Sequence, residues 1–150
     1  MIHELKLAEQ VCFASHLFHN KGLSNGGGEV RFSLSDAYAK ATACTYFSTY
    51  EGFGNAFVEA VLARRPIFVN NYEPVYIPDI GSKGFKTVMI EHGELTGKAV
   101  SEMAEIIYNP TLAGEIADYN FELGKKEFSL DTLREKLDQL IIKALNTAGR

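Results

Sequence analysis

The feature that most constrains the fold is a stretch in the middle of the chain that changes from strand-like to helix-like and back. An apolar, β-prone run at residues 43–47 ends at Ser48, and a turn with two glycines follows. Apolar residues then recur at helical spacing in residues 57–62, which predicts an amphipathic helix. Pro66 ends this helix, because proline lacks an amide hydrogen and restricts the residue before it. A second strand at residues 67–69 completes a βαβ unit.

The polar residues of this unit indicate a ligand site. Glu51 follows the first predicted strand, at the carboxyl end where open α/β sheets bind ligands. Gly52 and Gly54 let a ligand approach the backbone closely, and the next helix offers free N–H groups at its N-terminus. Glu59 lies on that helix, ~12 Å from Glu51 along the axis if every step between them were helical. Because Glu51 lies in the turn, we expect the two carboxylates to face one elongated ligand from two points.

This stretch resembles the glutamate, seven residues, glutamate motif of retaining, nucleotide-sugar-dependent glycosyltransferases with two Rossmann domains, the GT-B class, specifically family 4. The usual pattern is Ser-x-x-Glu-Gly-Phe-Gly, four residues and then Glu-Ala. Residues 48–60 match it as Ser-Thr-Tyr-Glu-Gly-Phe-Gly-Asn-Ala-Phe-Val-Glu-Ala. The similarity continues through residues 61–69, at the end of the helix and the next strand. The alternative interpretation is a generic βαβ unit with two solvated glutamates.

The resemblance implies roles for particular residues. In the family, the first glutamate contacts the transferred sugar, and the second bonds the ribose hydroxyls of the nucleotide. Glu51 would therefore be catalytic, and catalysis would consist of electrostatic stabilisation of a departing nucleoside diphosphate. Retention of the anomeric configuration and a nucleotide-diphosphate sugar as donor are further implications, with no metal or other cofactor. The donor-binding residues would be Gly52, Phe53, Gly54, Asn55 and Glu59.

The chain also departs from a complete enzyme of this family. With 150 residues it is too short for two Rossmann domains, so the amino-terminal acceptor domain would be missing or supplied by a partner chain. The similarity begins near Val11, and we find no counterpart of the family's phosphate-binding Arg and Lys. We expect residues 1–150 to form a single domain that resembles part of the carboxy-terminal donor domain, with little or no activity alone. An aromatic loop at residues 70–80 replaces the family's Gly-Gly segment and leaves the base, sugar and acceptor open.

Two alternatives belong to other classes. A non-catalytic nucleotide-sugar binding module would work together with a partner chain. A hydrolase would use Glu51 and Glu59 as an acid–base pair, which requires carboxyl groups ~5–5.5 Å apart for retention or ~6.5–9.5 Å apart for inversion. Because Glu51 lies in the turn and Glu59 on the body of the helix, such a short carboxylate separation is not expected, and the hydrolase is the less favoured alternative.

Charge and cysteine content bear on nucleic-acid binding and on the cellular compartment. A net charge of −4 disfavours non-specific nucleic-acid binding, which needs a basic face. Cys12 and Cys44 both lie in apolar runs and form no metal or disulfide pattern, so we expect buried, reduced thiols and a cytoplasmic protein. We expect loop histidines at His16 and His19 and a surface loop at the glycine-rich residues 24–28. The lysines in residues 81–86 are expected to be solvated, with phosphate contact as the alternative.

The expected architecture is α/β: a three-layer, Rossmann-like fold with a short, mainly parallel sheet and helices on both faces. About four strands are predicted, at residues 11–14, 43–47, 67–69 and 87–90. Helices are expected after a cap at Ser33 or Ser35, at residues 95–108, at 111–123 after Asn109-Pro110, and as a C-terminal tail after Ser129. The leucine stripe of the tail is assigned to core packing. An exposed sheet edge would permit a homo-oligomer.

Overall fold

A computed structural model describes residues 2–18 and 32–148 of the chain. The chain divides into two compact units, Met1–Ala41 and Thr42–Arg150, and each is described here by itself. Among the described residues, no helix has both the length and the apolar character that a membrane crossing requires. The cytoplasmic location stays a prediction.

The first unit contains a short helix with a well-formed start. Helix α1 (Leu34–Lys40) begins after Ser33, whose side chain accepts from the Asp36 backbone while the Asp36 carboxylate accepts from the Ser33 N–H at 2.8 Å. These hydrogen bonds hold the pKa of Asp36 below its usual value. Of the two predicted caps, Ser33 is the one used. His16 lies exposed in the 3-10 helix η1 (Ser15–Leu17), whereas His19 and the glycine-rich loop lie outside the described residues.

Two expectations for the first unit are wrong. The predicted strand at residues 11–14 is irregular backbone, and no described residue pairs with it. A β-strand needs a neighbour to receive its backbone hydrogen bonds, and the apolar run alone does not supply one. Cys12, expected to be buried, is exposed as part of this segment. Cys44 in the second unit is half-buried, and burial raises the pKa of its thiol.

The second unit is built on a parallel sheet of three strands in the order β1-β2-β3. In register, Cys44 pairs with Ile67 and Phe68 pairs with Val88. The three strands confirm three of the four predicted, and β1 forms an edge of the sheet among the described residues. Self-association through this edge stays a prediction. The strand bounds are β1 (Cys44–Tyr46), β2 (Ile67–Asn70) and β3 (Val88–Ile90).

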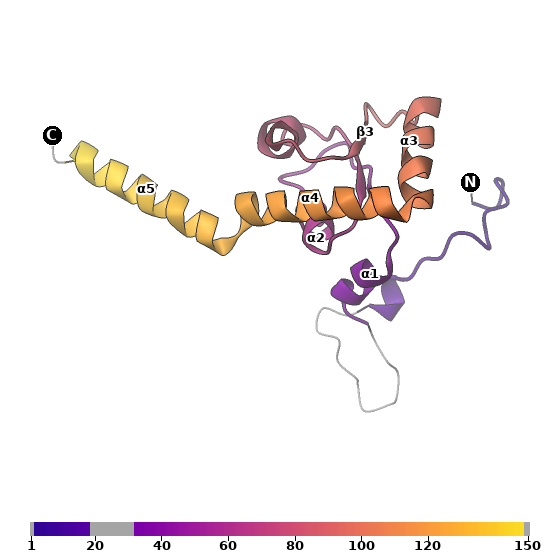
Figure 1. Ribbon diagram of the computed structural model, residues 1–150. Coiled ribbons are helices and arrows are strands. Elements are labelled where there is room, and N and C mark those ends of the chain that lie inside the picture. The colour runs from indigo at the N-terminus through magenta and orange to yellow at the C-terminus, as the bar shows by residue number, and fades with distance from the viewer. Residues whose placement is uncertain (1, 19–31, 149–150) are drawn as a thin grey trace. The chain divides into compact units, whose positions relative to one another are not determined.

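Helices flank this sheet on both sides, which confirms the α/β, Rossmann-like architecture (Figure 1). Helix α4 starts with Pro110 in its first turn and with Asn109 accepting from the Leu112 N–H at 3.1 Å, as the Asn-Pro pair predicted. The helices are α2 (Asn55–Leu62), the π-helix η2 (Tyr76–Ile80), the 3-10 helix η3 (Gly81–Lys83), α3 (Gly97–Tyr108), α4 (Pro110–Phe128) and α5 (Leu130–Ala148).

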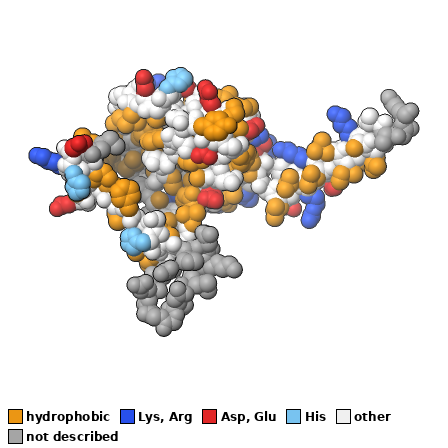
Figure 2. All heavy atoms as spheres, turned by 180° about the vertical axis from the view of Figure 1, so that it is seen from behind, with side chains coloured by type: hydrophobic (Ala, Val, Ile, Leu, Met, Phe, Trp, Pro, Cys, Tyr) orange, Lys and Arg blue, Asp and Glu red, His pale blue; other side chains and the backbone are white. Residues whose placement is uncertain are grey.

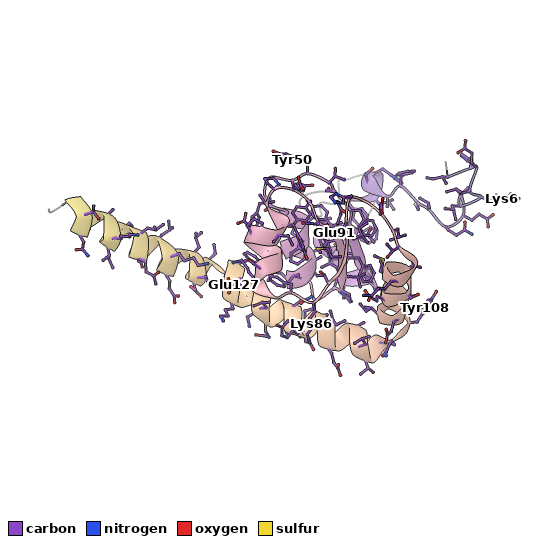
Figure 3. All side chains as sticks on the ribbon, turned by 90° about the horizontal axis from the view of Figure 1, so that it is seen from above. Lys6, Tyr50, Lys86, Glu91, Tyr108 and Glu127 are labelled. Carbon is purple, nitrogen blue, oxygen red and sulfur yellow. The ribbon has the colours of Figure 1, made fainter. Side chains whose placement is uncertain are left out.

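Each face of the sheet has its own helix cover. On one face, α3 and the first half of α4 pack against Phe68, Val88 and Ile90. Figures 1 and 3 show α2 on the opposite side of the strands from α3. Successive side chains of a strand point to opposite faces, so Ile67 and Val69 are directed to the α2 side. All residues of β2 are buried, as expected for a central strand covered on both faces.

Helix α4 also fixes α2 and the segment before β3. A Cβ added at Gly124 would lie 2.7 Å from Val61 Cγ1, so α4 and α2 approach too closely there for a side chain. Asn120 is fully buried and bonds both backbone groups of Lys86, accepting from its N–H at 2.8 Å and donating to its C=O at 2.7 Å. The backbone that enters β3 is therefore tied to α4.

Helix α5 begins after Ser129 as predicted, but its leucine stripe is not part of the core. Leu130 is 82% exposed and Leu137 48% exposed. In Figure 2, orange side chains lie openly along this helix. The sequence pattern identified the amphipathic helix correctly, but it carries no information on whether a second surface covers the apolar face.

Candidate functional site

The candidate site lies at the carboxyl ends of β1 and β2, where the chain leaves the sheet. The Glu51 N–H donates to the Glu73 C=O at 3.2 Å, and the Glu73 N–H donates to the Thr49 C=O at 3.1 Å. These bonds continue parallel pairing beyond the strands and hold the Glu51 backbone against the loop after β2. The prediction that this loop lies beside Glu51 is confirmed.

Asn70, the last residue of β2, ties three segments together. Its side chain is buried, with 1% exposed. Its Nδ2 donates to the Ser48 C=O at 2.9 Å, and its Oδ1 accepts from the Gly93 N–H at 2.9 Å. Both ends of the amide are satisfied, as a buried polar group requires. Asn70 thus fixes the start of the turn that carries Glu51.

The glycine turn is shaped by a left-handed residue and by an aromatic ring below it. Gly54 precedes α2 with φ 100°, a conformation that favours glycine. A Cβ at this position would lie 2.8 Å from Cζ of the buried Tyr72 ring. The Tyr72 hydroxyl donates to the Phe53 C=O at 3.5 Å. Gly52, by contrast, has open space where a side chain would be.

The N-terminus of α2 faces this turn without a side-chain cap. Gly54 occupies the N-cap position and supplies no side-chain acceptor to the first N–H groups of the helix. Such N–H groups, with the partial positive charge of the helix dipole, are suited to an anion such as phosphate. Asn55, the first residue of the helix, is exposed.

Hydrogen bonding with the side chains of Ser48 and Tyr46 lowers the pKa of the Glu51 carboxyl group below its usual value. Tyr46 has the opposite shift: burial first, and then its bond to Glu51, raise the pKa of its hydroxyl to about 12. Glu59 also contributes to the shift at Tyr46, so this hydroxyl lies within electrostatic reach of both predicted glutamates. Sequence reasoning did not select Tyr46, although its place at the end of a strand, just before Ser48, was a usable signal.

Glu59 is exposed and lines a groove of about 620 Å³ between α2, the η2–η3 segment and the junction of α4 with α5. The groove brings Phe53, Asn55 and Glu59 together with the start of α5, whereas Glu51 is not among its described lining residues. The predicted site therefore has two parts, the Glu51 turn and the Glu59 groove, and Tyr46 lies within electrostatic reach of both glutamates. The lining residues are Phe53, Asn55, Val58, Glu59, Leu62, Pro78, Asp79, Lys83, Glu127, Phe128, Ser129, Thr132, Leu133 and Lys136.

The aromatic side chains of the loop after β2 are mostly not free to stack on a base. Tyr72 and Tyr76 are 0% and 3% exposed. In the segment after β1, by contrast, Phe47, Tyr50 and Phe53 are exposed; Tyr50 is labelled in Figure 3.

The lysines of residues 81–86 bind the chain's own side chains. Lys83 pairs with Glu127 at 3.2 Å, and Lys86 Nζ lies 4.4 Å from the centre of the Tyr119 ring. Their first role is thus to hold the segment before β3 on α4. In the part of the chain that the structure describes, no group of three or more His, Cys, Asp or Glu residues is placed to hold a metal ion.

The fold defines a Rossmann-like α/β unit, and the candidate site lies at the carboxyl ends of its parallel strands, where folds of this class bind ligands. Comparison with known proteins adds a more specific relationship. The chain is 34% identical over 117 residues to mannosylglucosylglycerate synthase of Thermotoga maritima, covering 70% of this chain and 27% of that protein. It is also 34% identical over 117 residues to the protein of the same name from Petrotoga mobilis, covering 69% of this chain and 27% of that protein.

Both relatives are glycosyltransferases, so the chain is related to part of a sugar-transferring enzyme. It spans about a quarter of their length. No protein-family model matches the chain, and no solved structure matches it.

Proposed function

We propose that this chain is the donor-binding part of a retaining GT-B glycosyltransferase of family 4 and that it binds a nucleotide-diphosphate sugar at the Glu51 turn. The observation that carries the proposal is the arrangement of Glu51, the glycine turn and the uncapped N-terminus of α2 at one end of the sheet. The similarity to two glycosyltransferases supports it.

In this proposal each part of the site has one task. The Glu51 carboxylate, whose pKa is lowered by hydrogen bonding with Ser48 and Tyr46, accepts hydrogen bonds from hydroxyls of the transferred sugar. The backbone at Gly54 and Asn55 and the N-terminus of α2 hold the diphosphate and stabilise the charge that develops as it departs. Glu59 bonds the ribose hydroxyls from the groove side. No metal ion takes part.

The proposed donor site includes no residues assigned to bind the acceptor. We propose that an amino-terminal acceptor domain or a partner chain completes the enzyme. By analogy with the name of the relatives, mannose is the first sugar to test and a glucosylglycerate the first acceptor. This chain alone binds the donor without transferring its sugar, and measurable sugar transfer by the chain alone would contradict that part of the proposal.

Calorimetric titration tests the donor site. Nucleoside diphosphates of adenine, guanine and uracil, and their sugars, are titrated into the wild-type chain, Glu59→Ala and Glu51→Gln. We expect one base to bind, with Glu59→Ala weakening the diphosphate and its sugar alike. Glu51→Gln should weaken only the sugar-bearing ligands. The absence of binding at millimolar ligand would overturn the proposal that this chain holds the donor by itself.

A further inference from the structure

The groove beside Glu59 has a wall that the proposed donor site does not include. Three of the proposed donor-binding residues, Phe53, Asn55 and Glu59, line this groove. The first two turns of α5 line it as well, through Leu133 and Lys136. Its volume of about 620 Å³ lies in the range of small-molecule sites, ~300–1,000 Å³. A ligand held by Glu59 in this groove would therefore meet α5.

The start of α5 is fixed to the end of α4 by hydrogen bonds. The Thr132 N–H donates to Ser129 Oγ at 3.1 Å, and the Thr132 hydroxyl donates to the Lys126 C=O at 2.7 Å. The Leu133 N–H donates to the Ser129 C=O at 3.0 Å. A serine that accepts from the first N–H groups of a helix stabilises its first turn. The part of α5 that lines the groove therefore has a defined position relative to α4.

The end of α4 is in turn held against the glycine turn. The Phe128 ring meets the Phe53 ring edge to face with centres 5.8 Å apart, and it stacks on Phe85 at 5.9 Å. Glu127, labelled in Figure 3 near the end of α4, pairs with Lys83 at 3.2 Å, and both side chains are partly buried. A continuous set of contacts thus runs from the proposed donor turn to the start of α5.

The residues that α5 contributes suit a nucleotide. Of the two lysines that line the groove, Lys83 is paired with Glu127, whereas Lys136 has no ion pair with any residue that the structure describes. An ammonium group without a partner is suited to a phosphate. Leu133 is half-exposed and offers apolar surface to the flat face of a base.

The carboxylates of the groove limit where the phosphates of such a ligand can lie. Besides the paired Glu127, the groove carries the carboxylates of Glu59 and Asp79. Carboxylates repel a phosphate, but they accept hydrogen bonds from ribose hydroxyls and from N–H groups of a base. The phosphates therefore belong beside Asn55 at the N-terminus of α2 and beside the ammonium group of Lys136.

We propose that the groove holds the nucleoside of the donor and that the first two turns of α5 form a wall of this subsite. Leu133 contacts the base, and Lys136 supplies positive charge to the diphosphate. The inference rests on the proposed function for the identity of the ligand. It adds to the donor site a segment that lies far along the chain from the glycine turn.

Helix α5 offers matched controls for both residues. Leu140 and Lys143 follow Leu133 and Lys136 by seven residues, which places them ~10 Å farther along the same face of the helix. Leu133 and Leu140 are similarly exposed, at 52% and 61%. The described lining residues of the groove include neither Leu140 nor Lys143. The same substitution at the two positions therefore changes α5 in the same way and the groove in only one case.

NMR titration of the nitrogen-15-labelled full chain separates the contribution of the base from that of the phosphates. Adenosine, guanosine, uridine and the diphosphate of each are titrated into the wild type, Leu133→Ala, Lys136→Met, Leu140→Ala and Lys143→Met. We expect one nucleoside and its diphosphate to shift the backbone amides of Glu59 and of residues 132–136.

The two groove variants should differ in which ligands they weaken. Leu133→Ala should weaken the nucleoside and its diphosphate alike, by about threefold to tenfold, because both ligands bring the same base to the apolar wall. Lys136→Met should weaken only the diphosphate, by about threefold to tenfold, and should make its binding less sensitive to salt. Leu140→Ala and Lys143→Met should bind both ligands as the wild type does.

The outcomes distinguish this inference from the proposed function. If a diphosphate shifts the amides of residues 52–55 but binds the groove variants as tightly as the control variants, the α5 wall is overturned and the donor site remains. If a nucleoside shifts residues 132–136 while its diphosphate leaves residues 52–55 in place, the groove remains a nucleoside site and the proposed function is overturned. The absence of binding at millimolar ligand would overturn both. Circular dichroism establishes that each variant is folded.

Discussion

The ring of Tyr72 occupies the space that a side chain at Gly54 would need, with Tyr72 Cζ 2.8 Å from the position of that Cβ. Two distant segments, the turn after β1 and the loop after β2, therefore meet at a point where only glycine fits. The same tyrosine donates to the Phe53 C=O. The close approach explains why the turn carries a glycine immediately before α2, beyond the requirement set by its φ of 100°.

Gly54→Ala should destabilise the turn and abolish donor binding. The left-handed backbone costs ~1–2 kcal/mol for a residue with a Cβ, and displacement of the buried Tyr72 ring adds ~1–3 kcal/mol. Urea unfolding measures the loss of stability, and calorimetric titration measures the loss of donor binding. Gly52→Ala is the control: open space surrounds that position, so its stability should change by no more than ~0.5 kcal/mol. Equal losses of unfolding free energy in Gly54→Ala and Gly52→Ala would contradict the claim that the Tyr72 ring excludes a side chain at Gly54.

Adjacent asparagines give a test of the support behind Glu51. Asn70→Ala leaves the Ser48 C=O and the Gly93 N–H without their buried partner, at ~1–3 kcal/mol for each group. Asn71 makes one exposed bond to Glu91 at 3.0 Å, so Asn71→Ala should cost less than ~1 kcal/mol. Denaturant unfolding of the two variants measures both losses of stability. A larger loss of unfolding free energy in Asn71→Ala than in Asn70→Ala would contradict the supporting role of Asn70.

Two glycines of α4 should respond to alanine with opposite signs. At Gly124 the new Cβ would meet Val61 of α2, so Gly124→Ala should destabilise the chain by ~1–3 kcal/mol despite the better helix propensity of alanine. Gly114 has open space, and Gly114→Ala should stabilise the chain by up to ~1 kcal/mol. Thermal unfolding of both variants checks the sign, and a stabilised Gly124→Ala chain would show that α2 and α4 are farther apart.

The exposed stripe of α5 should contribute little to the stability of this chain. Leu137→Ala removes a half-exposed side chain and should change the free energy of unfolding by no more than ~0.5 kcal/mol. Ile80→Ala, at a fully buried position, should cost ~2–5 kcal/mol. A cost of 2 kcal/mol or more for Leu137→Ala would mean that a surface covers α5 in solution.

Local chemistry allowed the starts and ends of several helices in both units to be predicted. The proline after the Arg64-Arg65 pair, the Asn109-Pro110 start of α4 and the Ser33 cap of α1 each follow from backbone constraints that act within a few residues. The parallel pairing of β1 with β2 followed from the helix between them.

Long-range contacts were the part that the sequence could not supply. The strand predicted at residues 11–14 and the burial of the α5 leucines both required a partner surface that a local pattern does not specify. The aromatic residues of the loop after β2 were identified as unusual, but their place under the turn depends on Tyr72 reaching Gly54.

The most direct test of the donor-site proposal is an NMR titration of the nitrogen-15-labelled chain with nucleoside diphosphates of adenine, guanine and uracil. The account predicts that one of them shifts the backbone amides of Gly52, Phe53, Gly54 and Asn55, together with that of Glu59, while the Gly114 amide on α4 stays in place. Saturable shifts confined to other parts of the chain, or no shifts at millimolar nucleotide, would contradict it.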